Sequence, residues 1–445
     1  MATTQKNIIG EVISIRGLVA RVAIYTQDKP PMHELLILEN SRNVLLEVEK
    51  YQDSDTAFCV ILRGDKDVHK GDKVIRTNST ISIPVGEHAM GRMFNALGLP
   101  IDNGEEIKDV PRKGIYDMTH PYEAISSEKN YELLETGIKV VDFFTPFVKG
   151  SKIGIAGGAG VGKTVLISAI IHSVAKKKIA MPMFTGIGER IHEGQEMYEA
   201  LKATGLLKEA VLFMGQMNES ASIRTLVGRS AAALAQYYRD EEHKDILFFV
   251  DNIYRFVQAG NELSTMMGEI PSEGAYQPTI FSDLRRFQER LYSTDNGSIT
   301  AVQTIYIPAD DVTDPAVQEI EQQLDSVIVL SRKKAENNIY PAVDLLATRS
   351  SMVTPQIVGE RHYNLVTKVQ AVIQRYESLR TIVSIIGEHE LSQEDRVNYR
   401  KARTLVKYFA QELYGSGDLS GQGASYFDKK DTLDGVEEIL NSENI

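Results

Sequence analysis

One short segment limits what this chain can fold into: it reads Gly157-Gly-Ala-Gly-Val-Gly162-Lys163-Thr164, a complete G-x-x-x-x-G-K-T motif. The strand-type apolar run 152–156 precedes the motif, and the helix-type run 165–175 follows it. Backbone N–H groups of such a glycine-rich turn can wrap a polyphosphate, and the helix N-terminus adds partial positive charge. A turn that binds nothing can carry the same pattern, but the strand and the helix around this one favour binding. The chain is therefore expected to bind a nucleoside triphosphate.

The motif also predicts which residues contact the nucleotide. Lys163 is expected to reach the β- and γ-phosphates, and the Thr164 hydroxyl is expected to ligate Mg²⁺. The remaining expected contacts are Gly158, Ala159, Gly160, Val161, Gly162 and Val165.

Composition excludes several other classes of protein. A formal net charge of −12 argues against nucleic acid as a main partner, because binding phosphates needs a basic surface. The single cysteine, Cys59, cannot form an internal disulfide, which favours a reducing compartment, and its apolar neighbours predict a small buried side chain. We find no apolar leader and no run of ~18 apolar residues. We therefore expect a cytoplasmic protein that does not itself span a membrane.

The length of 445 residues predicts two or three domains. Residues 1–86 contain short β-type runs separated by turn residues, as in a small barrel or sandwich. In residues 87–358, apolar β-rich runs alternate with helical patterns, which predicts an α/β domain with a largely parallel sheet. Residues 359–445 are mainly helical in pattern, in three segments followed by a glycine-rich stretch and a short amphipathic helix: 363–374, 379–387, 393–411, 415–423 and 432–440.

Polar residues follow three of the predicted parallel strands. They are Lys163 and Thr164 after the first strand, Glu189 and Arg190 after the second, and Asp251 and Asn252 after the fourth. Ligands of open α/β sheets bind beyond the carboxyl ends of the strands. We therefore predict that these side chains share one site.

Two acidic residues suit phosphoryl transfer. Asp251 ends the apolar run Ile246-Leu-Phe-Phe-Val, and a carboxylate there can orient the water shell of Mg²⁺, although Asp after a strand also serves as a helix N-cap. Glu189 can polarise the water that attacks the γ-phosphorus, or it can be half of a surface pair with Arg190. Spacing alone leaves both functions of Glu189 open.

Several motifs spread over the chain match one protein family. They are Gly137-Ile-Lys-Val-Val-Asp142, Gly157–Thr164, Gly188-Glu-Arg-Ile-His-Glu-Gly194, Gly215-Gln-Met-Asn-Glu219, Asp251-Asn-Ile-Tyr-Arg-Phe256, Ala259-Gly-Asn-Glu262, Tyr276-Gln-Pro-Thr279, Ile307-Pro-Ala-Asp-Asp-Val-Thr-Asp-Pro315 and Ile339-Tyr-Pro-Ala-Val-Asp344. Over residues 7 to about 415 the chain resembles the catalytic β subunit of F-type ATP synthase. The resemblance implies a RecA-like P-loop domain between an N-terminal β-barrel and a C-terminal helical domain.

The resemblance also implies roles for individual residues. Glu189 matches the glutamate that activates the attacking water, where the related α subunit has glutamine. Arg190 and Arg255 match arginines at the phosphates, and Glu193 and Asp251 match acids around the metal. Tyr340 matches the aromatic residue that stacks on adenine.

The family further implies an assembly. Its catalytic subunits alternate with non-catalytic α subunits in a hexameric ring, and α supplies an arginine finger to each active site. A loop of the helical domain, here 389–395, pushes a rotating central stalk. Proton-channel and stator subunits complete the machine, so this chain is expected on the cytoplasmic face of the membrane without entering it.

Three positions depart from the family where aromatic side chains complete the adenine pocket. These positions hold Lys407, Ala410 and Leu413, so adenine is expected to be held more weakly unless Tyr408 or Phe409 substitutes. Three functions stay open: a catalytic subunit of a proton-coupled ATP synthase, the ATPase of a specialised motor without proton translocation, or a non-catalytic ring subunit. The intact phosphate loop and acidic residues argue against the third. A flagellar-type or Rho-like homohexamer fits less well.

Overall fold

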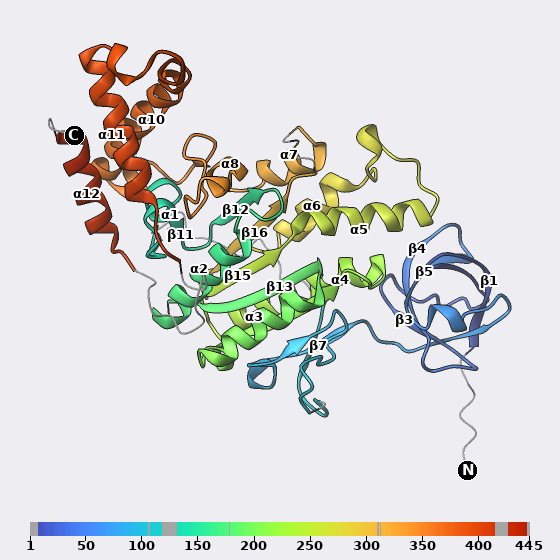
Figure 1. Cartoon of the computed structure of the whole chain (residues 1–445). Helices are drawn as coiled ribbons and strands as arrows, with labels where there is room; N and C mark the ends of the chain where they lie inside the picture. The colour runs from blue at the N-terminus through green and yellow to red at the C-terminus, as the bar shows by residue number, and fades with distance from the viewer. Residues whose placement is uncertain are drawn as a thin grey trace. The chain divides into compact units, whose positions relative to one another are not determined.

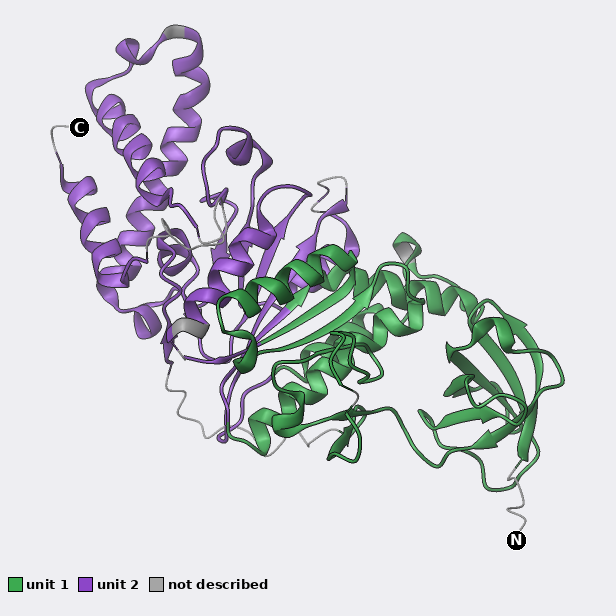
Figure 2. Ribbon diagram, turned by 60° about the horizontal axis from the view of Figure 1, so that its bottom comes forward, with its two compact units in different colours: residues 1–123, 183–243, 250–291 green, residues 124–182, 244–249, 292–445 purple. Residues whose placement is uncertain are grey.

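The structure, a computed structural model, describes residues 8–105, 107–117, 131–177, 179–308, 311, 313–413 and 426–442. It divides into two compact units, coloured in Figure 2. Unit 1 comprises residues 1–123, 183–243 and 250–291, and unit 2 comprises residues 124–182, 244–249 and 292–445. The predicted glycine-rich segment 415–423 lies outside the described residues, as do three residues of the 307–315 motif.

Unit 1 begins with a closed barrel, blue in Figure 1, with the strand order β1-β2-β5-β4-β3-β6. Its strands are β1 (Ile8–Arg16), β2 (Val19–Ile24), β3 (Leu35–Leu38), β4 (Leu45–Tyr51), β5 (Thr56–Arg63) and β6 (Lys73–Arg76). Alternate side chains of these strands point inward, and Val12, Leu36 and Leu46 are fully buried there. Cys59 is also buried in this core, which raises the pKa of its thiol to about 12. The cysteine is thus a buried hydrophobic side chain, as predicted.

The rest of unit 1 holds part of the mainly parallel sheet and its helices. β14 (Val211–Gln216) lies between β13 (Met181–Glu189) and β8 (Met93–Phe94) and is parallel to both, while β7 (Ser82–Pro84) pairs with β9 (Arg112–Gly114). The helices are α3 (Ile191–Ala203), α4 (Ala221–Asp240), α5 (Ile253–Met266) and α6 (Ile280–Gln288), with 3₁₀ turns η1 (Asp65–Asp67), η2 (Gly86–Ala89), η4 (Leu207–Glu209) and η5 (Glu273–Ala275). The small buried residues Ala231, Ala232, Ala233 and Ala235 let α4 pack closely, and the helix contacts both β14 and barrel strand β5.

Unit 2 holds the other part of the sheet. β12 (Lys152–Gly157) lies between β16 (Ile299–Tyr306) and β17 (Ser326–Val329), parallel to both, and β18 (Arg349–Ser350) runs antiparallel beside β17. The boundary between the two units falls within β15 (Ile246–Asp251): residues 246–249 belong to unit 2, and residues 250 and 251 belong to unit 1. The strands are continuous apolar runs because both faces of such a sheet are buried. The unit also contains β10 (Leu133–Leu134), β11 (Phe147–Val148), α1 (Lys139–Phe144), α2 (Lys163–Lys177), α7 (Pro315–Gln322), α8 (Arg332–Glu336) and α9 (Pro355–Val358).

The C-terminal part of unit 2 is helical, orange to red in Figure 1. It consists of α10 (Glu360–Ile386), η7 (Glu388–Glu390), α11 (Gln393–Phe409) and α12 (Lys429–Asn441). α10 and α11 pack together through the rings of Tyr376 and Tyr399, whose centroids lie 4.8 Å apart, and through the guanidinium of Arg375, which donates to both carboxylate oxygens of Asp395 at 2.8 and 3.0 Å. Gly387, with φ +89°, ends α10.

The predicted fold class is confirmed: a β-barrel, a parallel-sheet α/β region and a helical region follow one another. One helical prediction is wrong, because 363–374 and 379–387 belong to the single helix α10. The domain boundaries at residues 86 and 358 stay predictions, since the two compact units divide the chain differently.

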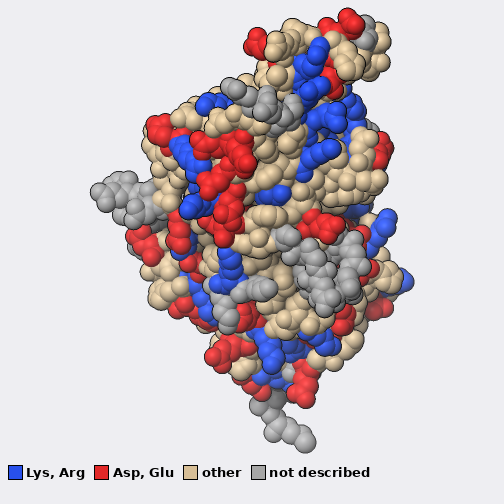
Figure 3. All heavy atoms as spheres, turned by 60° about the vertical axis from the view of Figure 1, so that its left-hand side comes forward, with Lys and Arg blue, Asp and Glu red and all other residues tan. Residues whose placement is uncertain are grey.

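No helix in the described ranges is both long and apolar enough to cross a bilayer. Figure 3 shows Lys and Arg interspersed with Asp and Glu on one face, and the described residues drawn there form no continuous basic surface.

Candidate nucleotide-binding and catalytic site

The predicted phosphate-binding loop joins β12 to α2 in unit 2. Gly160 and Gly162 have φ angles of +74° and +90°, a left-handed backbone that glycine adopts without strain. A Cβ atom at Gly160 would meet nothing within 4 Å, so glycine is required there by the backbone angle and not by crowding. Ala159 and Gly160 are exposed at the tip. The loop therefore has the conformation in which successive backbone N–H groups can hold an anion.

Lys163 and Thr164 open helix α2. The Nζ atom of Lys163 donates a hydrogen bond to the carbonyl of Gly157 at 2.8 Å and lies 5.5 Å from the ring centroid of Tyr306. The lysine thus reaches back across the loop that precedes it, and Thr164 is exposed on the first turn of the helix. Both side chains have the access that their predicted roles require.

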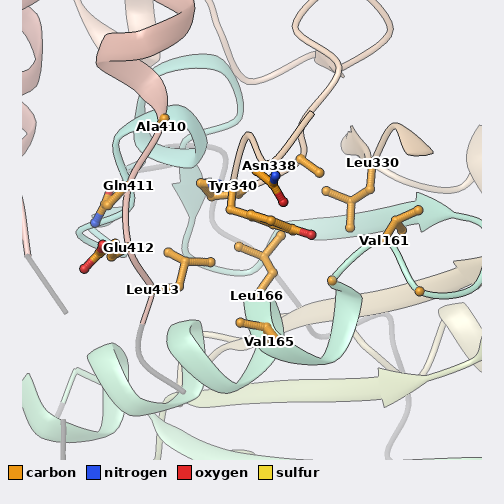
Figure 4. Close-up of a pocket in the computed structure, with 14 residues that line it drawn as sticks. Val161, Val165, Leu166, Leu330, Asn338, Tyr340, Ala410, Gln411, Glu412 and Leu413 are labelled. Atoms are coloured by element: carbon orange, nitrogen blue, oxygen red, sulfur yellow. The ribbon is translucent and has the colours of Figure 1, made fainter. Parts of the chain in front are cut away.

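A cavity of about 740 Å³ adjoins the loop within unit 2. Figure 4 shows its lining, which comes from the phosphate loop, the start of α2, the segment around Tyr340 and the segment after α11. Tyr340 is 44% exposed, and a Cβ atom at Gly162 would lie 3.9 Å from its ring. The loop and the aromatic ring therefore border one cavity, as a nucleotide with its phosphates at one end and its base at the other requires.

The three residues that replace the family's adenine-pocket residues do not all line the cavity. Ala410 and Leu413 line the cavity, whereas Lys407 does not. The suggestion that Tyr408 or Phe409 replaces the missing aromatic residue is wrong. Phe409 packs against Phe143 and Phe144, with ring centroids 5.1 and 5.2 Å apart. Neither Tyr408 nor Phe409 lines the cavity, so Tyr340 is its one aromatic side chain in the described part of the chain.

Three carboxylates of unit 1 gather in a second part of the candidate site. Oxygen atoms of Glu189, at the end of β13, Glu193, in the first turn of α3, and Asp251, at the end of β15, all lie within 4.8 Å of one another. Glu189 is buried, and the side-chain amide of Asn252 donates to its Oε1 at 2.8 Å. The sequence analysis named all three acids as candidate site residues, and the structure brings them together from three separate elements.

The environment of Glu189 changes its acidity. Burial, and then the negative charge of Asp251, raise the pKa of the Glu189 carboxyl to about 8, against the opposing hydrogen bond from Asn252. Three clustered carboxylates are a donor set that suits a hard, oxygen-binding cation such as Mg²⁺. The residues therefore fit the predicted metal.

The two predicted arginines differ in environment. Arg190 is exposed at the start of α3, while Arg255 on α5 is half-buried. The Nε atom of Arg255 is buried without a hydrogen-bond partner among the described residues, as expected of a group that awaits an anion. Its side chain lies over Gly188, where a Cβ atom would come within 2.9 Å of Arg255 Cδ.

The sequence placed Asn252 in the shared site but did not predict that its side chain holds Glu189. The signal was its place beside Asp251 at a strand end. Its backbone is left-handed, with φ +69°, a conformation that Asn adopts more readily than most residues. In this conformation Asn252 turns the chain out of the strand after Asp251 and is the N-cap residue of helix α5.

The predicted residues fall into two groups. Lys163, Thr164 and Tyr340 belong to unit 2, and Glu189, Glu193, Asp251 and the two arginines belong to unit 1. Within each unit the structure brings them together. The meeting of the two groups on one nucleotide stays a prediction from the strand pattern.

Comparison with known families agrees with this geometry. Residues 137–350 match the ATP synthase alpha/beta family, nucleotide-binding domain. Residues 351–421 match the C-terminal domain of V and A type ATP synthase, so the two matches are adjacent and together cover more than half of the chain. The fold and the matches support an alpha/beta-type subunit of a rotary ATP synthase or ATPase.

Proposed function

We propose that this chain is the catalytic, β-type subunit of an F-type-like rotary ATPase. It hydrolyses or synthesises Mg-ATP at an interface with an α-like subunit, coupled to rotation of a central stalk and to proton transport. The observation that carries the proposal is the buried carboxylate of Glu189, which Asn252 holds beside Glu193 and Asp251. A non-catalytic nucleotide site needs no such acid, and a solvated Glu–Arg pair would not be buried.

The residues divide the work of phosphoryl transfer. Lys163 and the loop 158–162 hold the phosphates, and Tyr340 stacks on the base. Glu189 orients the attacking water and accepts its proton, while Arg190 and Arg255 face the charge that develops on the γ-phosphoryl group. Thr164, Glu193 and Asp251 would hold Mg²⁺, which would supply positive charge to the phosphates. That charge also favours the ionised form of Glu189 that the reaction needs.

The proposal includes partners. An α-like subunit supplies an arginine finger, and a γ-like stalk contacts the loop 389–395. In the structure this loop includes η7 and the start of α11, where the hydroxyl of Ser392 accepts a hydrogen bond from Asp395 N at 3.1 Å. A capped helix start gives the loop a defined shape against which a stalk can push.

The test is Glu189→Gln in the assembled enzyme. We expect turnover to fall by about 10²–10⁴-fold, the usual contribution of a positioned acid or base, while Mg-ATP affinity changes little. Glu196→Gln, at an exposed position of α3, is the matched control and is expected to leave both quantities unchanged. Full turnover in the Glu189 variant would contradict the catalytic role and favour a non-catalytic ring subunit.

The coupling needs a separate measurement. Gentle purification of the tagged chain from native membranes, with the bound subunits identified by mass, is expected to yield an α-like subunit, a stalk, stator subunits and a proton-channel ring. An α-like partner without a channel ring would instead favour a specialised motor that performs other mechanical work.

A further inference from the structure

Gln411 links three segments of unit 2 that meet beside the base cavity. Its backbone N–H donates to the carbonyl of Tyr340 at 2.8 Å. Its side-chain oxygen accepts from the backbone N–H of Lys139 at 3.0 Å, and its side-chain nitrogen donates to the carbonyl of Gly137 at 2.9 Å. Gln411 thus connects the segment of the stacking ring to the start of α1.

Both polar atoms of the Gln411 side-chain amide have a hydrogen-bond partner at this position. The N–H of Lys139 and the carbonyl of Gly137 present one donor and one acceptor, and a neutral amide satisfies both at once. The side chain is 8% exposed, so losing it would leave buried backbone groups without partners. A carboxylate could accept from Lys139 but could not donate to Gly137.

A second contact, from Lys139 to Tyr408, holds the same stretch of chain three residues before Gln411. Lys139 Nζ donates to the carbonyl of Tyr408 and lies between two aromatic rings, 4.4 Å from the centroid of Tyr408 and 4.5 Å from that of Phe427. Cation–π contacts of this kind are favourable when the ammonium is partly desolvated. The segment 408–413 is therefore held at two points, and Ala410 and Leu413 within it line the cavity.

We infer that Gln411 is a positioning residue for the base end of the nucleotide site. It ties the segment of Tyr340 to the segment that carries Ala410 and Leu413, and Figure 4 shows Tyr340 and Leu413 among the side chains that line the cavity. Because Tyr340 is the one aromatic residue of this lining in the described ranges, base affinity depends on how Gln411 places Leu413 relative to it. The inference rests on the proposed nucleotide site and adds the residue that shapes its base pocket.

The test compares two probes on the full chain by displacement of a fluorescent nucleotide: Mg-ATP and inorganic tripolyphosphate, which has no base. Gln411→Leu is expected to weaken Mg-ATP binding about tenfold, in line with the worth of stacking a base on an aromatic ring. Tripolyphosphate affinity is expected to stay within about twofold, because the three hydrogen bonds of Gln411 named above go to Tyr340, Lys139 and Gly137, which lie outside the phosphate loop. Gln411→Glu, which keeps one of the two side-chain bonds, is expected to lie between wild type and Gln411→Leu.

Thr348→Val is the matched control. Thr348 is buried in the same unit, and its hydroxyl accepts from Val329 N at 3.0 Å; neither residue lines the cavity. It is expected to change neither affinity. Equal losses for both probes in Gln411→Leu, or no loss for either, would overturn the positioning role while leaving the proposed function intact. If the wild-type chain bound neither probe, the proposed function itself would fail, and the inference with it.

Discussion

Gly188 lies directly before Glu189 and contacts the side chains of two arginines. Its φ of +65° requires a left-handed backbone, and an added Cβ would lie 2.9 Å from Arg255 Cδ and 3.3 Å from Arg224 Cδ. Both atoms lie in the middle of their side chains, so neither arginine can yield by moving only its end. The glycine is therefore required by backbone angle and by crowding together.

We expect Gly188→Ala to lower the free energy of unfolding by about 2–3 kcal/mol, of which about 1 kcal/mol comes from the left-handed backbone. Gly205→Ala is the matched variant, because Gly205 has a φ of +74° and open space around it, and it is expected to show the backbone part alone. Urea unfolding of both variants measures the difference. Equal losses would mean that the arginines rearrange without penalty.

The base cavity leads to a prediction about nucleotide selectivity. Its described lining offers one aromatic ring, Tyr340, together with apolar side chains such as Leu166 and Leu413. Stacking on a ring does not distinguish adenine from guanine, since every base has a π-face. We expect Mg-ATP and Mg-GTP to bind within about tenfold of each other, measured as dissociation constants by titration calorimetry. A strong preference for ATP would show that other residues supply adenine contacts.

Two polar residues of unit 1 have partners that the sequence alone did not reveal. Glu269 forms an ion pair with Lys50 of the barrel, and Ser264 donates to it at 2.7 Å. Ser220 accepts a hydrogen bond from Ile223 N at 3.3 Å and caps α4. The sequence did not show these partners, because one comes from another element and the other depends on the exact start of a helix.

At the scale of elements, strands were predicted more accurately than helices. The strand-type run 152–156 was placed correctly at the start of β12, and the short β-type runs of residues 1–86 form the barrel strands, because short apolar runs bounded by turn residues have few alternatives. The division of α10 was wrong because Arg375-Tyr-Glu-Ser378 is a polar interruption of the apolar pattern. The interruption contains no Gly or Pro, and Arg375 and Tyr376 both contact α11, so the helix continues. Contacts between elements decided the outcome, and periodicity cannot show them.

One such contact joins α10 to α1 and predicts a dependence on pH. His362 is buried, and its Nε2 donates to the carbonyl of Phe143 at 2.7 Å. Burial lowers the pKa of His362 to about 4 from an ordinary 6.5, against the opposing hydrogen bond to Phe143 and with a contribution from the positive charge of Lys429. The folded chain therefore holds this histidine neutral where the unfolded chain would protonate it.

Between pH 6.5 and 4 the unfolded state binds the proton more readily, so stability falls as the pH is lowered through this window. The loss from this group approaches about 3 kcal/mol at the acid end. Urea unfolding at several pH values is expected to give a flatter profile for His362→Gln than for wild type. His389→Gln, at an exposed position, should follow the wild-type curve. A His362 variant with the full wild-type slope would place the dependence on other groups.

At the scale of the whole molecule, the sequence predicted more of the residues expected to touch the nucleotide than of the residues that hold them in place. The motifs supplied the phosphate loop and the acids, because each follows a strand in a recognisable local pattern. The supporting roles of Gln411, Lys139 and Asn252 were not predicted, since these roles lie in hydrogen bonds to residues that are distant in sequence or in an unusual backbone conformation. Local pattern therefore predicts the groups that touch the substrate better than the groups that hold them.

The last prediction concerns what one chain can do alone. If the site lacks an arginine finger from an α-like subunit, the isolated chain should bind Mg-ATP yet hydrolyse it slowly. Arginine fingers are worth about 10³–10⁵ in turnover in related enzymes, because they neutralise charge that appears only in the transition state. We expect the assembled ring, purified from its native source, to exceed the isolated chain by at least ~100-fold per catalytic chain.

The comparison uses phosphate release at saturating Mg-ATP, with the Glu189→Gln ring as a control for contaminating ATPases. An isolated chain as fast as the ring would mean that one subunit contains the complete site. Arg190 or Arg255, both already present in unit 1, would then have to neutralise the transition state without help. Slow turnover with intact nucleotide affinity would instead show that binding belongs to the chain and catalysis to the interface, which is the property that lets a rotating stalk control when each site reacts.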